Sequence, residues 1–184
     1  MNYQVRPART GDVRSIRRLV DANVASGRLL DKATVTLYED IQEFLVADTE
    51  RDRPVIGCGA LHVMWEDLAE IRTIAVDETC QGEGVGQLIV AALLERAREL
   101  GVRRVFVLTF AEKFFGSFGF EEISGEAATP EVYAELLRSY DEGVAEFLDL
   151  DRVKPNTLGN TRMLLRLEHP ELPAGGSAWP GWRP

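Results

Sequence analysis

Apolar residues recur along this chain at two spacings, and each spacing predicts one kind of element. A spacing of three to four residues, typical of a helix with one buried face, is clearest from Val85 to Leu100, and Gly101 then ends the helix. Apolar runs bounded by turn residues predict strands, as in Val55 to Trp65. The predicted helices are 10–25, 34–43, 85–100, 114–118 and 130–140, and the predicted strands are 3–7, 44–47, 55–65, 70–76, 105–109 and 161–167.

The order of these elements predicts one α/β domain. The length of 184 residues suits a single domain. Strands surround a strand–turn–helix unit in the middle of the chain, which favours one mixed sheet sandwiched between helices. We therefore expect a domain over residues 1–168. Proline, glycine and serine dominate residues 169–184, and this composition predicts a disordered tail.

Composition and charge exclude several classes of partner. The formal net charge is −9, whereas nucleic acids and anionic membranes bind basic surfaces. The longest apolar run, Leu88 to Leu94, is too short to span a bilayer, and no apolar run follows the basic residues near the N-terminus. Cys58 and Cys80 make neither a disulfide framework nor a metal cluster, so we expect no metal. A reducing cytoplasm is the expected compartment.

The segment between the strand at 70–76 and the helix at 85–100 carries the most specific signal. It reads Gln81-Gly82-Glu83-Gly84-Val85-Gly86, with three alternating glycines at a helix start. Glycines lack the Cβ atom that would keep the backbone away from an oxygen-rich ligand. Because the N–H groups of a helix start bind anions, this loop predicts a phosphate site that locally outweighs the acidic net charge.

Two other glycine motifs do not fit this loop. A dinucleotide-binding fingerprint needs its third glycine three residues after the second, and that position is Gln87. A Walker loop needs Gly-Lys-Ser/Thr at the helix start, and this segment has no lysine. The remaining alternative is a flexible glycine turn without a ligand. The flanking sequence must decide between this turn and a phosphate-binding loop.

The flanking sequence resembles the GCN5-related N-acetyltransferase family. That family has Gln/Arg-x-x-Gly-x-Gly/Ala between a central strand and a long helix, which Gln81, Gly84 and Gly86 match. Its second element, a strand followed by an aromatic helix ending in Gly-Phe, is matched by 105–109 and 114–120. The resemblance implies a strongly bent mixed sheet, with helices on both faces and two central parallel strands that splay apart.

The same resemblance implies acetyl-CoA as the cosubstrate. Residues 74–76 would bond the pantetheine arm like an added strand, with the N–H of Val76 facing the thioester oxygen, and residues 81–87 would hold the pyrophosphate. The implied cofactor-binding residues are Ile74, Ala75, Val76, Gln81, Gly82, Glu83, Gly84, Val85, Gly86 and Gln87.

The transfer of an acetyl group to an amine needs a base, because only a neutral amine attacks a thioester. Glu70 is the candidate, since it matches the base position of many relatives. Strict alternation along its strand would also put its side chain on the same face as that of Val76. The alternative is a solvated glutamate at a strand start. The thiolate leaving group needs little help from an acid, because a thiol has a pKa of about 8.5.

The general acid stays open. Many relatives place a tyrosine at the first turn of the aromatic helix, and this chain has Phe115 there. Thr109 matches a hydroxyl position of amino-acid-acetylating relatives and could donate a proton through water, or it could simply cap the strand end. His62 is interpreted as a packed histidine and as the next candidate base after Glu70.

The last strand points to the acceptor. Residues 154–165 contain Asn-x-x-x-Asn-Thr-Arg, which resembles the acetyltransferase domain of bacterial N-acetylglutamate synthases, and segments 28–32, 69–73 and 106–109 support this resemblance. It implies acetylation of glutamate, or of glutamine, as the first step of arginine biosynthesis. Cations and amides suit the carboxylates of such an acceptor. The implied acceptor-binding residues are Lys32, Arg72, Asn160, Thr161 and Arg162.

Two departures from that family keep alternatives open. Larger synthases carry an amino-acid-kinase-like domain, for which this chain leaves no room, and Asp31 stands where some relatives have a basic residue. Glutamine as the acceptor would tolerate the second departure. The alternatives are an acetyltransferase for another small amine or a protein N-terminus, and a non-catalytic sensor of acetyl-CoA or an amino acid. A homodimer is a further option.

Overall fold

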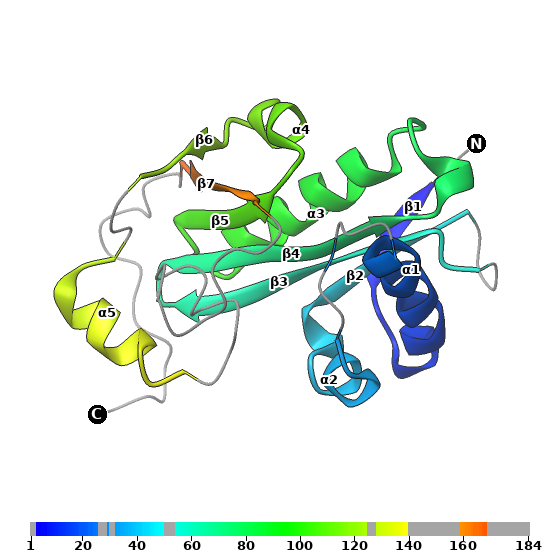
Figure 1. Ribbon diagram of the computed structural model, residues 1–184, viewed down its shortest axis with the longest axis horizontal. Coiled ribbons are helices and arrows are strands. Elements are labelled where there is room, and N and C mark those ends of the chain that lie inside the picture. The colour runs from blue at the N-terminus through cyan, green and yellow to red at the C-terminus, as the bar shows by residue number, and fades with distance from the viewer. Residues whose placement is uncertain are drawn as a thin grey trace.

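The computed structural model describes residues 3–25, 29, 32–49, 54–124, 128–139 and 159–168. Within these residues, seven strands form one sheet in the order β1-β2-β3-β4-β5-β7-β6 (Figure 1). The strands are β1 (Gln4–Pro7), β2 (Phe44–Asp48), β3 (Gly57–Trp65), β4 (Leu68–Val76), β5 (Arg104–Thr109), β6 (Glu121–Glu122) and β7 (Thr161–Arg166). The α-helices are α1 (Val13–Ala25), α2 (Thr34–Glu39), α3 (Val85–Glu99), α4 (Glu112–Gly116) and α5 (Pro130–Leu136).

The two central strands, β4 and β5, are the only parallel neighbours among the described strands. They pair over a short stretch, from Leu68 opposite Arg104 to Glu70 opposite Phe106. Beyond it, β4 continues along β3, whereas β5 continues along β7. The predicted splay of the central parallel strands is therefore confirmed.

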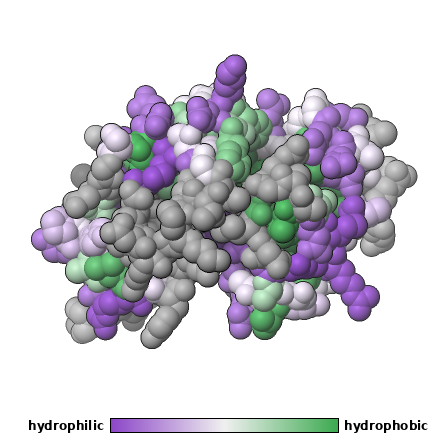
Figure 2. Space-filling view, in the orientation of Figure 1, coloured by the Kyte–Doolittle hydropathy of each residue, from purple (hydrophilic) through white to green (hydrophobic). Residues whose placement is uncertain are grey.

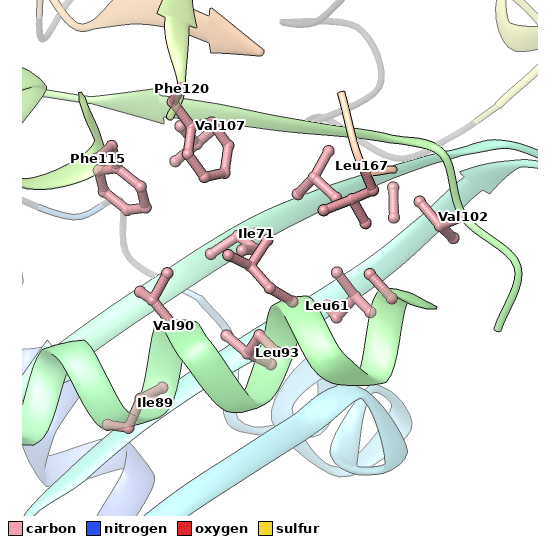
Figure 3. Close-up of a cluster of buried hydrophobic side chains, with 14 of the residues drawn as sticks. Leu61, Ile71, Ile89, Val90, Leu93, Val102, Val107, Phe115, Phe120 and Leu167 are labelled. Carbon is pink, nitrogen blue, oxygen red and sulfur yellow. The ribbon is translucent and has the colours of Figure 1, made fainter. Parts of the chain in front are cut away.

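Helices cover both faces of the sheet, as predicted. Helix α3 packs on one face, which we call the α3 face, and α1 and α2 pack on the other, the α1 face (Figure 1). Figure 3 shows Ile89, Val90 and Leu93 of α3 among the residues of the first core, with Leu61 and Ile71 contributed by the strands. The two faces thus have separate cores, and a side chain's position in one core identifies the face on which it lies.

Two glycines of β3 let α3 approach the sheet closely. A Cβ atom on Gly57 would lie 2.8 Å from Cδ1 of Ile89, and one on Gly59 would lie 2.8 Å from Cγ2 of Ile89. Neither glycine has a positive φ, so space rather than backbone conformation requires them. The close fit fixes the start of α3 beside the end of β4.

Most predicted elements are present, with shifted bounds. The predicted helix 34–43 is divided at Asp40 into α2 and a 3-10 turn at Ile41–Glu43, and α4 starts at Glu112, before the aromatic run. β6 was not predicted, because two exposed residues carry no periodic pattern. α5 ends at Leu136 and residues 137–139 are not helical, so the predicted helix 130–140 is too long; the tail 169–184 lies outside the described residues.

The described surface is mainly hydrophilic on the face that Figure 2 presents, where apolar residues form separate patches. Among the described helices, none combines the length and apolar composition that crossing a bilayer requires.

Candidate functional site

A β-bulge interrupts β4 in the middle of the site. Cys58 pairs with Ala75 and Ala60 pairs with Arg72, so two steps along β3 correspond to three steps along β4. The extra residue lies next to Thr73, which has φ of +59°, in the left-handed region that a β-branched residue rarely adopts. Such local strain persists where the surrounding structure enforces it, often at a binding site.

The bulge reverses the alternation of side chains along β4. Before it, Ile71 packs in the core of the α3 face, and its neighbours Glu70 and Arg72 point to the α1 face. After it, Val76 packs against the α3 core, while Ala75 is buried in the α1 core. The prediction that Glu70 and Val76 share a face is therefore wrong, because strict alternation ignores the inserted residue. The prediction that Glu70 and Arg72 share a face holds.

The glycine loop lines a cavity of about 460 Å³ at the start of α3. Gly82 and Gly84 have φ of +80° and +85°, and Gly84 is the N-cap of α3. Gly86 has no positive φ, so the backbone conformation does not require a glycine there. Eight of the predicted cofactor residues line the cavity, namely Ile74, Val76, Gln81, Gly82, Gly84, Val85, Gly86 and Gln87.

The two other predicted cofactor residues lie away from the cavity wall. Ala75 is buried in the α1 core, and the Glu83 carboxylate accepts a hydrogen bond from the Tyr3 hydroxyl. None of the residues that line the cavity is charged. An anion in it would therefore be held by the N–H groups and the dipole of the helix start rather than by a cationic side chain in the wall.

Asp77 anchors the loop to α1. Its carboxylate accepts a hydrogen bond from Arg18 Nη1 at 2.7 Å, and it also accepts from the N–H and hydroxyl of Thr79. The Arg18 bond is the main cause, and the Thr79 bonds the second cause, that lower the pKa of Asp77 from 3.8 to about 2. The ionised carboxylate is thus the form that the folded loop stabilises.

Replacing Asp77 with asparagine should lower the melting temperature at pH 7. A carboxylate with a lowered folded-state pKa contributes stability above its ordinary pKa, and this contribution is lost as the pH falls. The difference in melting temperature between wild type and Asp77→Asn should therefore shrink between pH 4 and about 2. Thermal unfolding of both proteins across this range tests the claim. A difference that stays constant with pH would contradict it.

A second cavity, of about 200 Å³, lies where β4 and β5 separate. Residues 71–74 of β4 and 107–109 of β5 contribute to its wall. It shares four lining residues with the first cavity, so the two adjoin. The shared residues are Asn23, Ile74, Ala111 and Phe114, and the predicted site residues Arg72, Thr109 and Asn160 line the second cavity.

Arg72 lies among carboxylates on the α1 face. Its Nη2 donates to Oε2 of Glu43 at 3.2 Å and lies 3.8 Å from Oδ2 of Asp40, and its Nη1 lies 3.9 Å from Oε2 of Glu70. Burial, followed by the nearby Glu43 carboxylate, raises the pKa of Asp40, and Arg72 and Lys32 oppose this rise. The predicted carboxylate clamp is therefore already engaged by acidic side chains.

The predicted site residues on β5 and β7 do not all point to the same face of the sheet. Thr109 Oγ1 accepts a hydrogen bond from the N–H of Ala111 at 2.9 Å, which is the geometry of a strand-end cap. Thr109 pairs with Thr161, whose hydroxyl donates to Glu112 of α4. Arg162 is the next residue along β7, so its side chain points to the opposite face from that of Thr161.

Sequence reasoning missed two carboxylates that contact Arg72 and two residues that line the cavities. Asp40 and Glu43 surround Arg72, and Asn23 and Phe114 line both cavities. No spacing signal links Glu43 to Arg72, since they are 29 residues apart and meet only when the sheet forms. Phe114 belongs to the aromatic helix that the family resemblance identified, but no binding role was predicted for it. Asp31 and residues 154–158 of the acceptor motif lie outside the described residues.

Comparisons with known proteins agree with this geometry. The profile of the acetyltransferase (GNAT) family matches residues 19–120. An amino-acid acetyltransferase of Mycobacterium tuberculosis is 58% identical over 164 residues, which cover 89% of this chain and 94% of that protein. A crystal structure from the same organism, in complex with CoA and NLQ, has a TM-score of 0.85 and 57% identity and covers 90% of this chain and 99% of that one. An N-acetylglutamate synthase from Neisseria gonorrhoeae, complexed with coenzyme A and N-acetyl-glutamate, has a TM-score of 0.71 and 27% identity; the match covers 92% of this chain and 36% of the synthase.

Proposed function

This chain belongs to the acetyltransferase (GNAT) family, and from that premise we propose that it acetylates the α-amino group of L-glutamate or L-glutamine. The acyl donor is acetyl-CoA. The similarity to an amino-acid acetyltransferase supports an amino acid as the acceptor, and the N-acetyl-glutamate complex of the gonococcal synthase supports glutamate. With glutamate as the acceptor, the reaction would be the first step of arginine biosynthesis.

The observation that carries the proposal is the pair of adjoining cavities at the splay of β4 and β5. The larger is lined by the glycine loop and suits the phosphate end of the donor, and the smaller reaches Arg72. The pantetheine arm would pass between them along the end of β4. The thioester would then lie near the bulge, between the separated strands.

In this arrangement Glu70 takes a proton from the ammonium group of the acceptor. The neutral amine attacks the thioester carbon, the carbon–sulfur bond breaks, and the amine loses its second proton as the amide forms. One of the two protons ends on the CoA thiolate and the other reaches the solvent. Arg72 and Arg162 would hold carboxylates of the acceptor, with Lys32, Asn160 and Thr161 assigned to the rest of its pocket, and Thr109 remains a candidate donor through water.

One observation favours a second candidate acceptor. Asp40, Glu43 and Glu70 all lie within 4 Å of Arg72, and such a group of carboxylates would suit a cationic amine such as a polyamine. Arg72 neutralises part of this charge, which is why the anionic amino acid remains the first choice.

A thiol-release assay distinguishes these acceptors. Purified protein with acetyl-CoA would be offered each of the twenty amino acids, then spermidine and a peptide N-terminus, with a reaction lacking amine as the control. We expect turnover with glutamate, glutamine or both. Turnover with spermidine alone would support the cationic acceptor, and binding of acetyl-CoA without turnover on any amine would support a sensor.

A further inference from the structure

His62 and Glu43 form a hydrogen-bonded pair next to the candidate base. His62 is the cross-strand partner of Glu70 in the β3–β4 ladder, so both side chains point to the α1 face. Nδ1 of His62 lies 2.6 Å from Oε1 of Glu43, a distance typical of a strong hydrogen bond to a charged group. Oε2 of Glu43 accepts from Arg72, so this carboxylate fixes both side chains that neighbour Glu70.

The bond to Glu43 sets the tautomer of His62. An ionised carboxylate can only accept a hydrogen bond, so Nδ1 must carry the proton. In neutral His62 the lone pair is then on Nε2, which can accept a second proton. A carboxylate bonded to the first nitrogen also stabilises the imidazolium that forms, as the buried aspartate does in a catalytic triad.

The candidate base needs a route for its proton. Each turnover leaves one proton on the base, and the Glu70 side chain is only 5% exposed. The His62 and Glu43 side chains are 20% and 23% exposed and so reach the solvent. Directly opposed residues in an antiparallel pair have Cβ atoms about 5 Å apart, which a side chain spans directly or through one water.

We propose that His62, positioned by Glu43, relays the proton from Glu70 to the solvent during acetyl transfer. Protonated Glu70 gives its proton to Nε2 of His62, and the Glu70 carboxylate is regenerated for the next acceptor. The imidazolium then releases a proton to water and returns to the neutral form. No other reactant is required. Of the two protons that the ammonium group loses, the relay delivers to the solvent the one that does not end on the CoA thiolate.

The charges around His62 favour this role. Glu43 and Asp40 contribute negative charge from the segment that follows α2, and Glu70 and Arg72 contribute opposite charges from β4. Lys32 adds a positive charge near Asp40. Carboxylates outnumber cations among them, and surplus negative charge stabilises the imidazolium intermediate. The relay rests on the proposed function, because it needs Glu70 to act as the base.

Buffer rescue provides the test. The His62→Ala variant should lower kcat about tenfold, with the acceptor KM and acetyl-CoA affinity near wild type, and added imidazole should restore much of the loss in proportion to its neutral fraction. His62→Gln, which keeps the size and polarity but not the basicity, should lower kcat by a similar factor.

Glu43→Gln should shift the pH profile of kcat, since the imidazolium loses its counter-charge. Asp67→Asn, which removes a carboxylate bonded to Arg104 in the turn that precedes β4, is the matched control and should keep the wild-type profile.

The outcomes separate the relay from the proposed function. Wild-type protein without turnover on any amine would overturn the proposed function and the relay with it. Normal wild-type turnover, with His62→Ala or His62→Gln retaining full kcat, would overturn the relay alone. A loss of kcat that no imidazole concentration restores, in a variant with wild-type melting behaviour, would also overturn it, because a packing defect does not respond to a soluble base.

Discussion

Replacing Glu70 with glutamine is expected to lower kcat about a hundredfold or more at pH 7, with little change in the acceptor KM. Glutamine keeps the shape of the side chain but cannot take a proton from the ammonium group. The loss should shrink as the pH rises, because the free amine is then already neutral. Steady-state kinetics from pH 6.5 to 10 would measure this convergence.

The matched control is a second buried carboxylate in the same sheet. Asp48 of β2 is 1% exposed and bonds to Gln4 and Arg6, and β3 separates its strand from that of Glu70. Asp48→Asn should lower the melting temperature while leaving kcat near wild type. If Glu70→Gln turns over normally at pH 7, the base lies elsewhere, and His62 becomes the first residue to test.

Replacing Gly84 with valine is expected to weaken acetyl-CoA binding about tenfold or more. The side chain would stand at the N-terminus of α3, where we propose that the backbone approaches the pyrophosphate. One lost charge-assisted hydrogen bond alone corresponds to roughly that factor. Titration calorimetry with CoA would measure the change.

The strain of the substitution has its own control. Gly84 and Gly101 have φ of +85° and +81°, so a valine is equally disfavoured at both ends of α3. Nothing lies within 4 Å of a Cβ atom on Gly101, and this residue lines neither cavity. Gly101→Val should therefore lower stability without weakening CoA binding. Equal affinities for both variants would show that the loop does not contact the cofactor.

Local patterns predicted much of this fold. The apolar stripe of α3 and the glycines before it are contiguous in the chain, so a spacing rule could find both the helix and the anion-binding start. The parallel pairing of β4 with β5 could not come from local spacing, and the resemblance to the acetyltransferase family supplied it. The two-residue β6 carried no pattern that a rule could detect.

The features that the sequence did not predict depend on contacts between residues far apart in the chain. The bulge at Thr73 is defined by the pairing of β4 with β3, which local sequence does not encode. No residue between Glu70 and Val76 indicates an insertion, since a threonine at position 73 is typical of a regular strand. Likewise, Glu43 was predicted as the polar end of a helix. Its bonds to His62 and Arg72 arise only when the turn after α2 folds onto the sheet.

The short contact between β4 and β5 has a mechanical consequence. Among the described residues, three consecutive ladder pairs, from Leu68 and Arg104 to Glu70 and Phe106, join one ribbon of four strands to another of three, and the Asp67 carbonyl adds hydrogen bonds from the N–H groups of Arg103 and Arg104. The first ribbon carries Glu70 and leads into the glycine loop, and the second carries Thr109 and leads into α4. The β4–β5 contact is therefore short enough to act as a hinge between the two ribbons. A small rotation about it would change the width of the gap between the splayed ends of β4 and β5 without breaking the strand pairing within either ribbon.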